Sequence, residues 1–275
     1  MLDKFIFENH LGQRFEGLPN GVYLNYSDLR DYAWSYETIN NRISRFYRGI
    51  TSRKIPLVVY CNSAEEAVSV MNRLHELAET DIVEKIPGKI FVGDYYTSGY
   101  ITASAKSNYL IRRKYCKIDL TFTSEDPTWY REQLHPFFPS TGNDIGSGGV
   151  DYPYDYPFDY SVSLNGRQIM CNSVGSSAFR LLIYGEATNP AVIINGHTYK
   201  VNGTIAKGET LLIDSVNKTI TLTTASGKKV NWFDNRWREE YIFEPLPAGQ
   251  STVTWAGSFG FDLTIIEKRS EPKWT

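Results

Sequence analysis

The sequence is poor in the residues and runs that mark several common protein classes. It has three cysteines among 275 residues, at positions 61, 116 and 171, and four histidines. An odd number of cysteines at these wide spacings fits neither a disulfide framework nor a zinc-binding pattern, so we expect a reducing compartment. No apolar run approaches the roughly 18 residues of a membrane span. Charges at Asp3, Lys4 and Glu8 interrupt any apolar stretch at the start, so we expect no secretory signal.

An excess of positive charge is also missing. The 29 basic and 31 acidic side chains are spread evenly, with 17 and 17 over residues 1–140 and 12 and 14 over the remainder. Neither half has the basic character expected of a nucleic-acid-binding protein. With 41% hydrophobic and 14% aromatic residues, the composition is that of a folded protein of one or two domains.

Motifs for catalysis and metal binding are missing as well. The sequence has no Gly-x-Ser-x-Gly motif, no phosphate-binding glycine loop and no EF-hand loop, and no histidine stands at a metal-ligand spacing. Asp151, Asp155 and Asp159 recur every four residues, but Pro153 and Pro157 forbid the helix that would bring them together. We therefore predict no catalytic residue, no metal site and no cofactor, and expect that the protein is not an enzyme.

What the sequence does have is tyrosine, 19 in all, and many short stretches of alternating polarity that are typical of strands. One helix is predicted over about residues 63–79, where Ser63 and Glu66 form a capping box and apolar residues follow at helical spacing. Strands are predicted at 55–61, 89–95 and 116–123. Residues 1–140 are therefore predicted to form a β domain that carries a single helix.

A change of composition marks the middle of the chain. Residues 139–149 are rich in glycine and serine, and residues 151–160 repeat Asp, Tyr and Pro, so we place a linker at 141–160. Beyond it, over 161–275, short predicted strands alternate with turn residues, at 179–184, 192–194, 210–213, 219–223, 241–243, 252–255 and 261–266. Three Asn-Gly pairs, at residues 165, 195 and 202, predict hairpin turns. This spacing is typical of a β-sandwich, so the predicted fold class is mainly β.

The aromatic residues of the second half leave two interpretations open. A sugar-stacking surface or core packing and subunit contacts would each account for Tyr184, Tyr199, Trp232, Phe233, Trp237, Tyr241 and Trp255. Core packing is the favoured interpretation, because Trp255 lies within a strand pattern. The residues predicted for a glycan or partner surface are Trp232, Trp237 and Tyr241.

Several motifs occur together in an order that resembles one protein family. They are Asp126-Pro127-Thr128-Trp129-Tyr130, the segment from Tyr152 to Tyr160, and a later series: Ile183-Tyr184-Gly185, Asn189-Pro190, Asn195-Gly196, Gly208-Glu209, Leu212-Ile213-Asp214 and Leu246-Pro247-Ala248-Gly249. On these motifs the chain resembles the distal tail (Dit-like) proteins of long-tailed bacteriophages. The likeness spans the whole chain and is strongest over residues 115–265, whereas residues 26–54 depart from it most.

The resemblance implies a first β domain that forms a homo-hexameric ring at the tail tip and a galectin-like β-sandwich as the second domain. It implies a structural hub that joins the tail tube protein to the tail-associated lysin or tail fibre and offers an attachment point to receptor-binding proteins of the baseplate. It also implies a place at the virion tail tip after assembly in the host cytoplasm. From the composition, we expect neither nucleic acid nor membrane as a partner. The alternative function is a lectin-like protein that recognises host cell-wall polysaccharide.

The ring contact is predicted in the segment from Glu37 to Arg53, which is rich in arginine and tyrosine and has little core pattern. Arginine and aromatic side chains are common anchors of protein interfaces. The residues predicted for this interface are Arg42, Arg45, Tyr47, Arg48 and Arg53.

Overall fold

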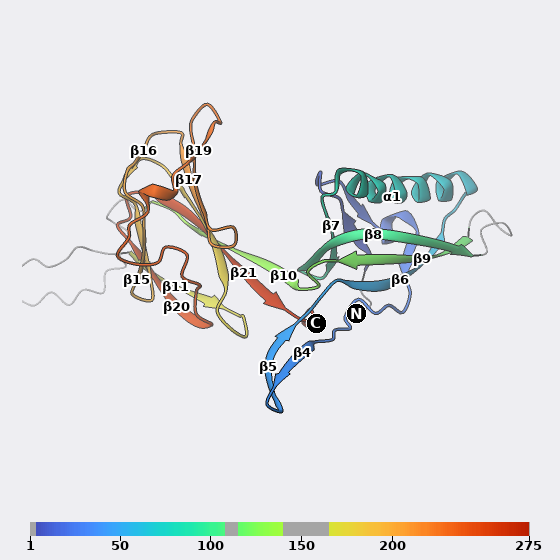
Figure 1. Cartoon of the computed structure of the whole chain (residues 1–275). Coiled ribbons are helices and arrows are strands. Elements are labelled where there is room, and N and C mark those ends of the chain that lie inside the picture. The colour runs from blue at the N-terminus through green and yellow to red at the C-terminus, as the bar shows by residue number, and fades with distance from the viewer. Residues whose placement is uncertain (1–3, 108–114, 140–164, 275) are drawn as a thin grey trace, which may run out of the picture. The chain divides into compact units, whose positions relative to one another are not determined.

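The computed structural model describes residues 4–107, 115–139 and 165–274 (Figure 1). The predicted linker, with its three repeated aspartates, lies outside the described residues. The chain divides into two compact units, which we call unit 1 (Met1–Arg131 with Lys268–Thr275) and unit 2 (Glu132–Glu267). As predicted, the described part of the chain consists mainly of strands and contains one α-helix.

Unit 1 is built from antiparallel strands and one long helix. Its elements are β1 (Ile6–Glu8), β2 (Arg14–Glu16), the 3-10 helix η1 (Leu18–Asn20), β3 (Val22–Leu24), β4 (Ser35–Ile39), β5 (Arg42–Tyr47), β6 (Thr51–Tyr60), α1 (Ala64–Glu84), β7 (Gly88–Val92), β8 (Tyr95–Ser107), β9 (Tyr115–Ser124) and the start of β10 (Trp129–Phe137). Two sheets share the long strand β8. The first half of β8 pairs with β7 in a sheet of order β2-β1-β7-β8. The second half pairs with β9 in a sheet of order β3-β6-β9-β8.

Helix α1 begins where the sequence predicts and extends beyond the predicted end at about residue 79. The Ser63 hydroxyl accepts a hydrogen bond from the Glu66 N–H at 3.0 Å, and Lys85 ends the helix in the left-handed conformation, at φ 56°. Asp81 lies in the additional turn and is fully buried. Its carboxylate accepts the backbone N–H of His10 at 2.9 Å, and the same oxygen lies 2.7 Å from His10 Nδ1. These contacts fix the last turn of the helix to the segment after β1, a role that a buried apolar residue would otherwise fill.

The core of unit 1 lies where the buried face of α1 meets the two sheets. Six large side chains of this core are almost fully buried: Phe5, Phe7, Phe15, Leu29, Phe122 and Trp129. The helix contributes Ala67, Val70, Leu74, Leu77 and Ala78. Unit 1 therefore has a hydrophobic core of its own.

Strands β4 and β5 form a separate two-stranded sheet, which we call the hairpin. Asn40 and Asn41 make its turn with φ of 50° and 60°, as a two-residue hairpin turn requires. Every residue of both strands is exposed. Figure 1 shows the hairpin reaching away from the other strands of unit 1.

Unit 2 is a β-sandwich, as predicted, with a small additional sheet of β13 and β16. Its elements are the end of β10, β11 (Asn165–Cys171), β12 (Ala178–Tyr184), β13 (Ala187–Thr188), β14 (Ala191–Ile194), β15 (His197–Lys200), β16 (Thr204–Ile205), β17 (Thr210–Asp214), β18 (Thr219–Thr223), β19 (Lys229–Asn231), the 3-10 helix η2 (Phe233–Asn235), β20 (Gly249–Trp255) and most of β21 (Gly260–Arg269). One sheet has the order β19-β18-β17-β12-β21 and the other β11-β20-β14-β15. Between them lies a core that includes Phe179, Tyr199, Trp255 and Phe261.

Three local predictions were wrong. The run 89–95 is two strands, because Gly93 turns the chain with φ 59° between β7 and β8. Residues 241–243 form a turn closed by the Glu244 N–H to Tyr241 carbonyl bond, and not a strand. Of the three Asn-Gly pairs, only Asn195-Gly196 closes a hairpin, between β14 and β15. The pair at 165 begins β11, and the pair at 202 separates β15 and β16, which do not pair with each other.

Candidate functional site

The hairpin has two different faces, because residues paired directly across two strands share a face and successive residues alternate, except at Ser44, where a β-bulge shifts the register. The register places one set together on the charged face: Ser35, Glu37, Ile39, Arg42, Arg45 and Tyr47. The other set forms the apolar face: Tyr36, Thr38, Ile43 and Phe46. The predicted residues Arg42, Arg45 and Tyr47 thus lie together.

The apolar face of the hairpin is not covered by any other described part of the chain. Tyr36 is 59%, Ile43 52% and Phe46 58% exposed. Among the described residues, the Phe46 ring contacts one other aromatic ring, that of Trp34. The two ring centres are 6.4 Å apart and the rings meet edge-on. A two-stranded hairpin is marginally stable by itself in water, and a contiguous exposed apolar patch marks an interaction surface. The hairpin is therefore the best candidate for a protein interface in unit 1.

The motif at residues 126–130 forms a tight polar turn next to the base of the hairpin. The Asp126 carboxylate accepts the Thr128 N–H at 3.1 Å, the Thr128 hydroxyl at 2.5 Å and the Tyr130 hydroxyl. Burial alone would raise the pKa of Asp126, but these hydrogen bonds and the charge of Arg48 outweigh burial and lower it. Asp126 is thus held as a carboxylate that orders the turn.

Two of the predicted interface residues bind this turn. Arg48 donates to the Thr128 hydroxyl at 2.8 Å, and its guanidinium lies 4.4 Å from the centre of the Trp34 ring. Arg53 donates from Nη2 to the Pro127 carbonyl at 3.2 Å and is only 3% exposed. Because Arg53 is buried, its side chain positions the base of the hairpin and offers no exposed contact surface. Arg48 is half-buried at the same base.

The predicted glycan or partner residues of unit 2 differ in accessibility. Trp232 is half-buried and packs against the sandwich core. Trp237 is half-buried under the Lys200 ammonium, 5.3 Å from the ring centre. Tyr241 is 55% exposed, with the Lys218 ammonium 5.4 Å from its ring centre. The ring contacts found among the described residues do not join the three, so only Tyr241 presents a largely open aromatic face.

The remaining aromatic candidates are less accessible. Trp255 is 6% exposed and donates from its indole N–H to the Phe259 carbonyl at 3.2 Å. Tyr199 is 1% exposed, and Tyr184 and Phe233 are half-buried. Core packing accounts for Trp255 and Tyr199, as the favoured interpretation expects.

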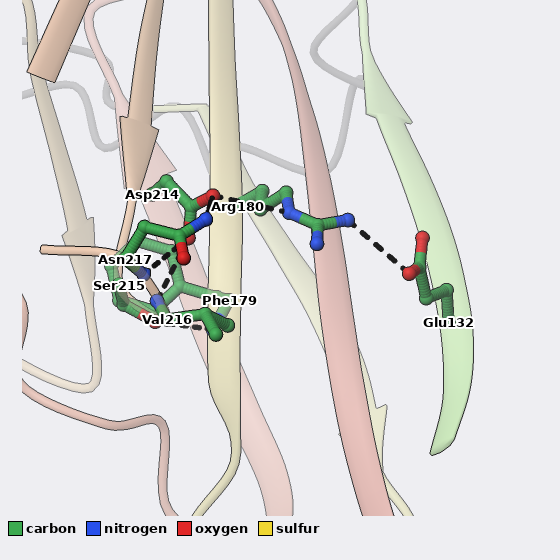
Figure 2. Close-up of polar contacts among 7 residues, drawn as sticks. All are labelled: Glu132, Phe179, Arg180, Asp214, Ser215, Val216 and Asn217. Atoms are coloured by element: carbon green, nitrogen blue, oxygen red, sulfur yellow. Dashed lines mark hydrogen bonds and ion pairs between the residues drawn. The ribbon is translucent and has the colours of Figure 1, made fainter. Parts of the chain in front are cut away.

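A polar cluster on unit 2 surrounds Asp214, as Figure 2 shows. The Asp214 carboxylate accepts the backbone N–H of Val216 at 2.8 Å, the backbone N–H of Asn217 at 3.1 Å and the Asn217 amide at 2.9 Å. Arg180 lies between Asp214, at 3.4 Å, and Glu132, at 3.2 Å. Burial would raise the pKa of Asp214, but the bonds from Asn217 and Val216 and the charge of Arg180 lower it. These contacts close the turn between β17 and β18, which is a structural role.

Two further findings concern the described residues as a whole. In residues 4–107, 115–139 and 165–274, no group of three or more His, Cys, Asp or Glu side chains is placed to hold a metal ion. In the same ranges, no helix is long and apolar enough to cross a membrane.

Comparison with known proteins gives matches to solved structures. No protein-family model matches the sequence, and no curated protein matches it. The crystal structure of SPP1 Dit, described as a paradigm of the hub adsorption apparatus in phages that infect Gram-positive bacteria, matches with a TM-score of 0.58 and 11% identity. The match covers 98% of this chain and 100% of that one. This chain has the fold of SPP1 Dit.

Chains of a phage baseplate have the same fold. The phage P2 baseplate in its activated conformation with calcium matches with a TM-score of 0.61 and 14% identity, over 99% of this chain and 100% of that one. The strontium form matches with a TM-score of 0.59 and 14% identity, over 98% and 99%. The Dit-like fold that the sequence motifs predict is thereby confirmed.

The sequence located the candidate interface segment but did not show that it is a free hairpin. The signal was present, because Asn40-Asn41 separates two short runs that contain β-branched and aromatic residues. The link from Arg48 and Arg53 to the turn at 126–130 gave no signal in the sequence, since 80 and 74 residues separate the partners.

Proposed function

We propose that the chain is a structural distal tail protein, a hub that joins a phage tail tube to the tail tip or baseplate and its receptor-binding apparatus. The observation that carries this proposal is the match in fold to SPP1 Dit over nearly the full length of both chains. In this role the chain supplies binding surfaces and no catalysis. Its place is the virion tail tip, after assembly in the host cytoplasm.

The proposed assembly is a hexameric ring of unit 1, with the hairpin as the contact between neighbours. A ring requires two different surface patches that meet head to tail around the axis. The hairpin supplies one such patch, with an exposed apolar face on one side and Arg42, Arg45 and Tyr47 on the other. The further partners in this proposal are the tail tube protein, a tail-associated lysin or tail fibre, and a receptor-binding protein.

The ring is tested by negative-stain electron microscopy and light scattering of the purified chain. We expect six-fold rings of about 190 kDa, which is six copies of the 31.4 kDa chain. Arg45→Glu combined with Tyr47→Ala should leave monomers, because it reverses a charge and removes an aromatic anchor on the same face. The matched control is Arg238→Glu with Tyr241→Ala in unit 2. Rings that form equally well with the hairpin variant would refute the assigned interface, and a chain that stays monomeric even with its tail tube protein would refute the ring.

A carbohydrate-binding role for unit 2 is the second candidate function. Its supporting observation is the exposed ring of Tyr241. The backbone carbonyl of the same residue lies 2.9 Å from His197 Nε2. Aromatic rings with neighbouring polar groups are suited to stacking on sugars. Saturable binding to host wall polysaccharide that is lost in Tyr241→Ala and kept in Tyr26→Ala, another exposed tyrosine, would support this role. Absence of saturable binding would refute it.

A further inference from the structure

The C-terminal end of helix α1 carries a second exposed apolar surface of unit 1. Ile82, Val83 and Ile86 are all exposed, and Val83 is 70% exposed. Ile82 and Val83 follow Glu79 at spacings of three and four residues, which place side chains next to one another on a helix surface. Ile86 comes two residues after the end of the helix. We call Ile82, Val83 and Ile86 the helix-end patch.

The fold holds the helix-end patch in a fixed place. Ile82 and Val83 lie next to the buried Asp81, whose contacts to His10 anchor the last turn of the helix. The backbone N–H of Ile86 donates to the Asp81 carbonyl at 3.2 Å, which ties the third member of the patch to the same turn. The patch is therefore part of the folded surface, and exposed apolar residues gathered on such a surface mark an interaction site.

The charges around the patch are negative. Glu76 and Glu79 lie on the same outward face of the helix as Val83, seven and four residues before it, and Glu84 follows it. The last turn of the helix holds no basic residue, and Lys85 comes only at the C-cap. Because the C-terminal end of a helix carries a partial negative charge, acidic residues are unfavourable there and cations are favourable. The patch therefore suits an apolar partner that brings basic side chains.

The hairpin has this complementary character. It combines its exposed apolar face with Arg42 and Arg45, against one acidic residue, Glu37. Helix α1, by contrast, has six acidic residues and one arginine. Because the hairpin consists of two strands about 4.8 Å apart, long arginine side chains of its charged face can reach around its edges to a surface that the apolar face covers.

Another exposed apolar surface of unit 1 lacks this match. Tyr23 and Tyr60 lie on the outer face of the sheet β3-β6-β9-β8. The strand register places Lys54 and Lys117 on the same face, with Asp119 as the one carboxylate among the described strand residues there. This face carries more positive than negative charge and would repel the arginines of the hairpin. Of the two surfaces, the helix-end patch is the one that complements the hairpin.

We infer that the hairpin of one copy docks on the helix-end patch of a second copy of this chain. The apolar face of the hairpin covers the patch, and its arginines lie beside Glu76 and Glu79. This inference rests on the proposed function, in which the hairpin joins neighbours in a ring. Figure 1 shows α1 on one side of the strands of unit 1 and the hairpin on the other. Each copy thus offers its hairpin to one neighbour and its helix end to the other, which is the head-to-tail arrangement that a closed ring requires.

Disulfide trapping tests this contact. A chain with Ile43→Cys, on the apolar face of the hairpin, is co-expressed with a tagged chain that carries Val83→Cys, and the mixture is oxidised. We expect a disulfide-linked pair of the two chains, which the tag distinguishes from pairs of identical chains. The matched control carries Tyr60→Cys in place of Val83→Cys, because Tyr60 is 62% exposed, and should give no mixed pair. The three native cysteines are buried. A pair that forms equally well with Tyr60→Cys, or no pair at all, would overturn the inference.

Charge reversal tests the complementarity. Glu76→Lys with Glu79→Lys should weaken association by about tenfold or more, because like charges would then face each other across the contact. Adding Arg42→Glu with Arg45→Glu to the same chain should restore association, since the charges are then exchanged across every contact. Reversals that each weaken association and do not compensate each other when combined would show that these charges do not meet, and the inference would be wrong.

A control and a hairpin variant separate the inference from the proposed interface. Glu186→Lys with Glu239→Lys reverses two exposed glutamates of unit 2 and should leave association unchanged. If Phe46→Ser dissociates the assembly and the reversal on the helix does not, the hairpin joins neighbours at another surface, and the inference is wrong. If neither Phe46→Ser nor the reversal on the helix changes the association, the proposed hairpin interface is wrong as well.

Discussion

Replacing Phe46 by serine is the most direct perturbation of the apolar face of the hairpin. Phe46 is 58% exposed, and its ring neighbour in the described chain is Trp34. The substitution therefore removes little that stabilises the single chain. If the hairpin is an interface, the same substitution removes apolar area that a neighbouring copy would cover.

The size of the effect follows from the exposed area. A buried aromatic side chain covers roughly 150–250 Å², so about 100 Å² of Phe46 is left for a partner. At about 25 cal/mol per Å², this area is worth about 2.5 kcal/mol per contact when fully covered. Since about 1.4 kcal/mol corresponds to a tenfold change in dissociation constant, we expect Phe46→Ser to weaken association by about tenfold to sixtyfold.

Sedimentation velocity over a concentration series measures this change, and thermal unfolding of the same samples checks the single chain. The matched control is Phe138→Ser, because Phe138 is 68% exposed and lies in unit 2. We expect the control to leave association unchanged and both variants to keep the free energy of unfolding within about 1 kcal/mol of the natural chain. Equal association of the Phe46→Ser variant and the natural chain would refute the assignment of the apolar face to an interface.

Three further predictions concern the framework of the two units. Asp81→Asn should lower the free energy of unfolding by about 1–3 kcal/mol, because it weakens the buried hydrogen bonds to His10. Calorimetry of the variant at neutral pH checks this prediction. An unchanged melting temperature would contradict it. Gly88→Ala should cost a similar amount, about 1–3 kcal/mol, because a Cβ there would lie 2.2 Å from Asp81 Oδ2; an unaltered urea midpoint would show that the site can relax. Folding lowers the pKa of Asp214, so its contribution to stability is complete above the unfolded-state pKa of about 3.9 and is lost as pH falls through the folded-state pKa. Urea titrations should therefore show a flatter acid decline for Asp214→Asn than for the natural chain, and parallel curves would refute the linkage.

Sequence patterns predicted those parts of the fold that depend on interactions between neighbouring residues. Helix α1 begins at Ser63 because the cap and the apolar spacing both lie in adjacent residues. Its end was missed because Asp81 is polar, and only its contact to His10, 71 positions away, explains why it is buried. The strand expected at residues 241–243 failed for a related reason. Ile242 and Phe243 are both buried, so the segment packs as a turn and does not alternate.

The candidate site was predictable as a segment but not as a geometry. Richness in arginine and tyrosine pointed to the stretch from Glu37 to Arg53. Composition could not separate Arg45, which lies on an exposed face, from Arg53, which is buried against Pro127. That difference depends on strand register and on a turn far along the chain, and neither is encoded by neighbours in the sequence.

The features that call for a second chain meet in one part of unit 1. Each unit has a hydrophobic core of its own, and the turns at Asp126 and Asp214 satisfy their carboxylates within the chain. In the hairpin, by contrast, the described residues leave an apolar face uncovered and both outer strand edges unpaired. Free edges and exposed apolar faces promote association, and folded proteins keep them where a partner covers them. A neighbouring copy that covers the hairpin would satisfy both features in a single contact, which is why the hairpin, and not the aromatic residues of unit 2, is the first place to test for assembly.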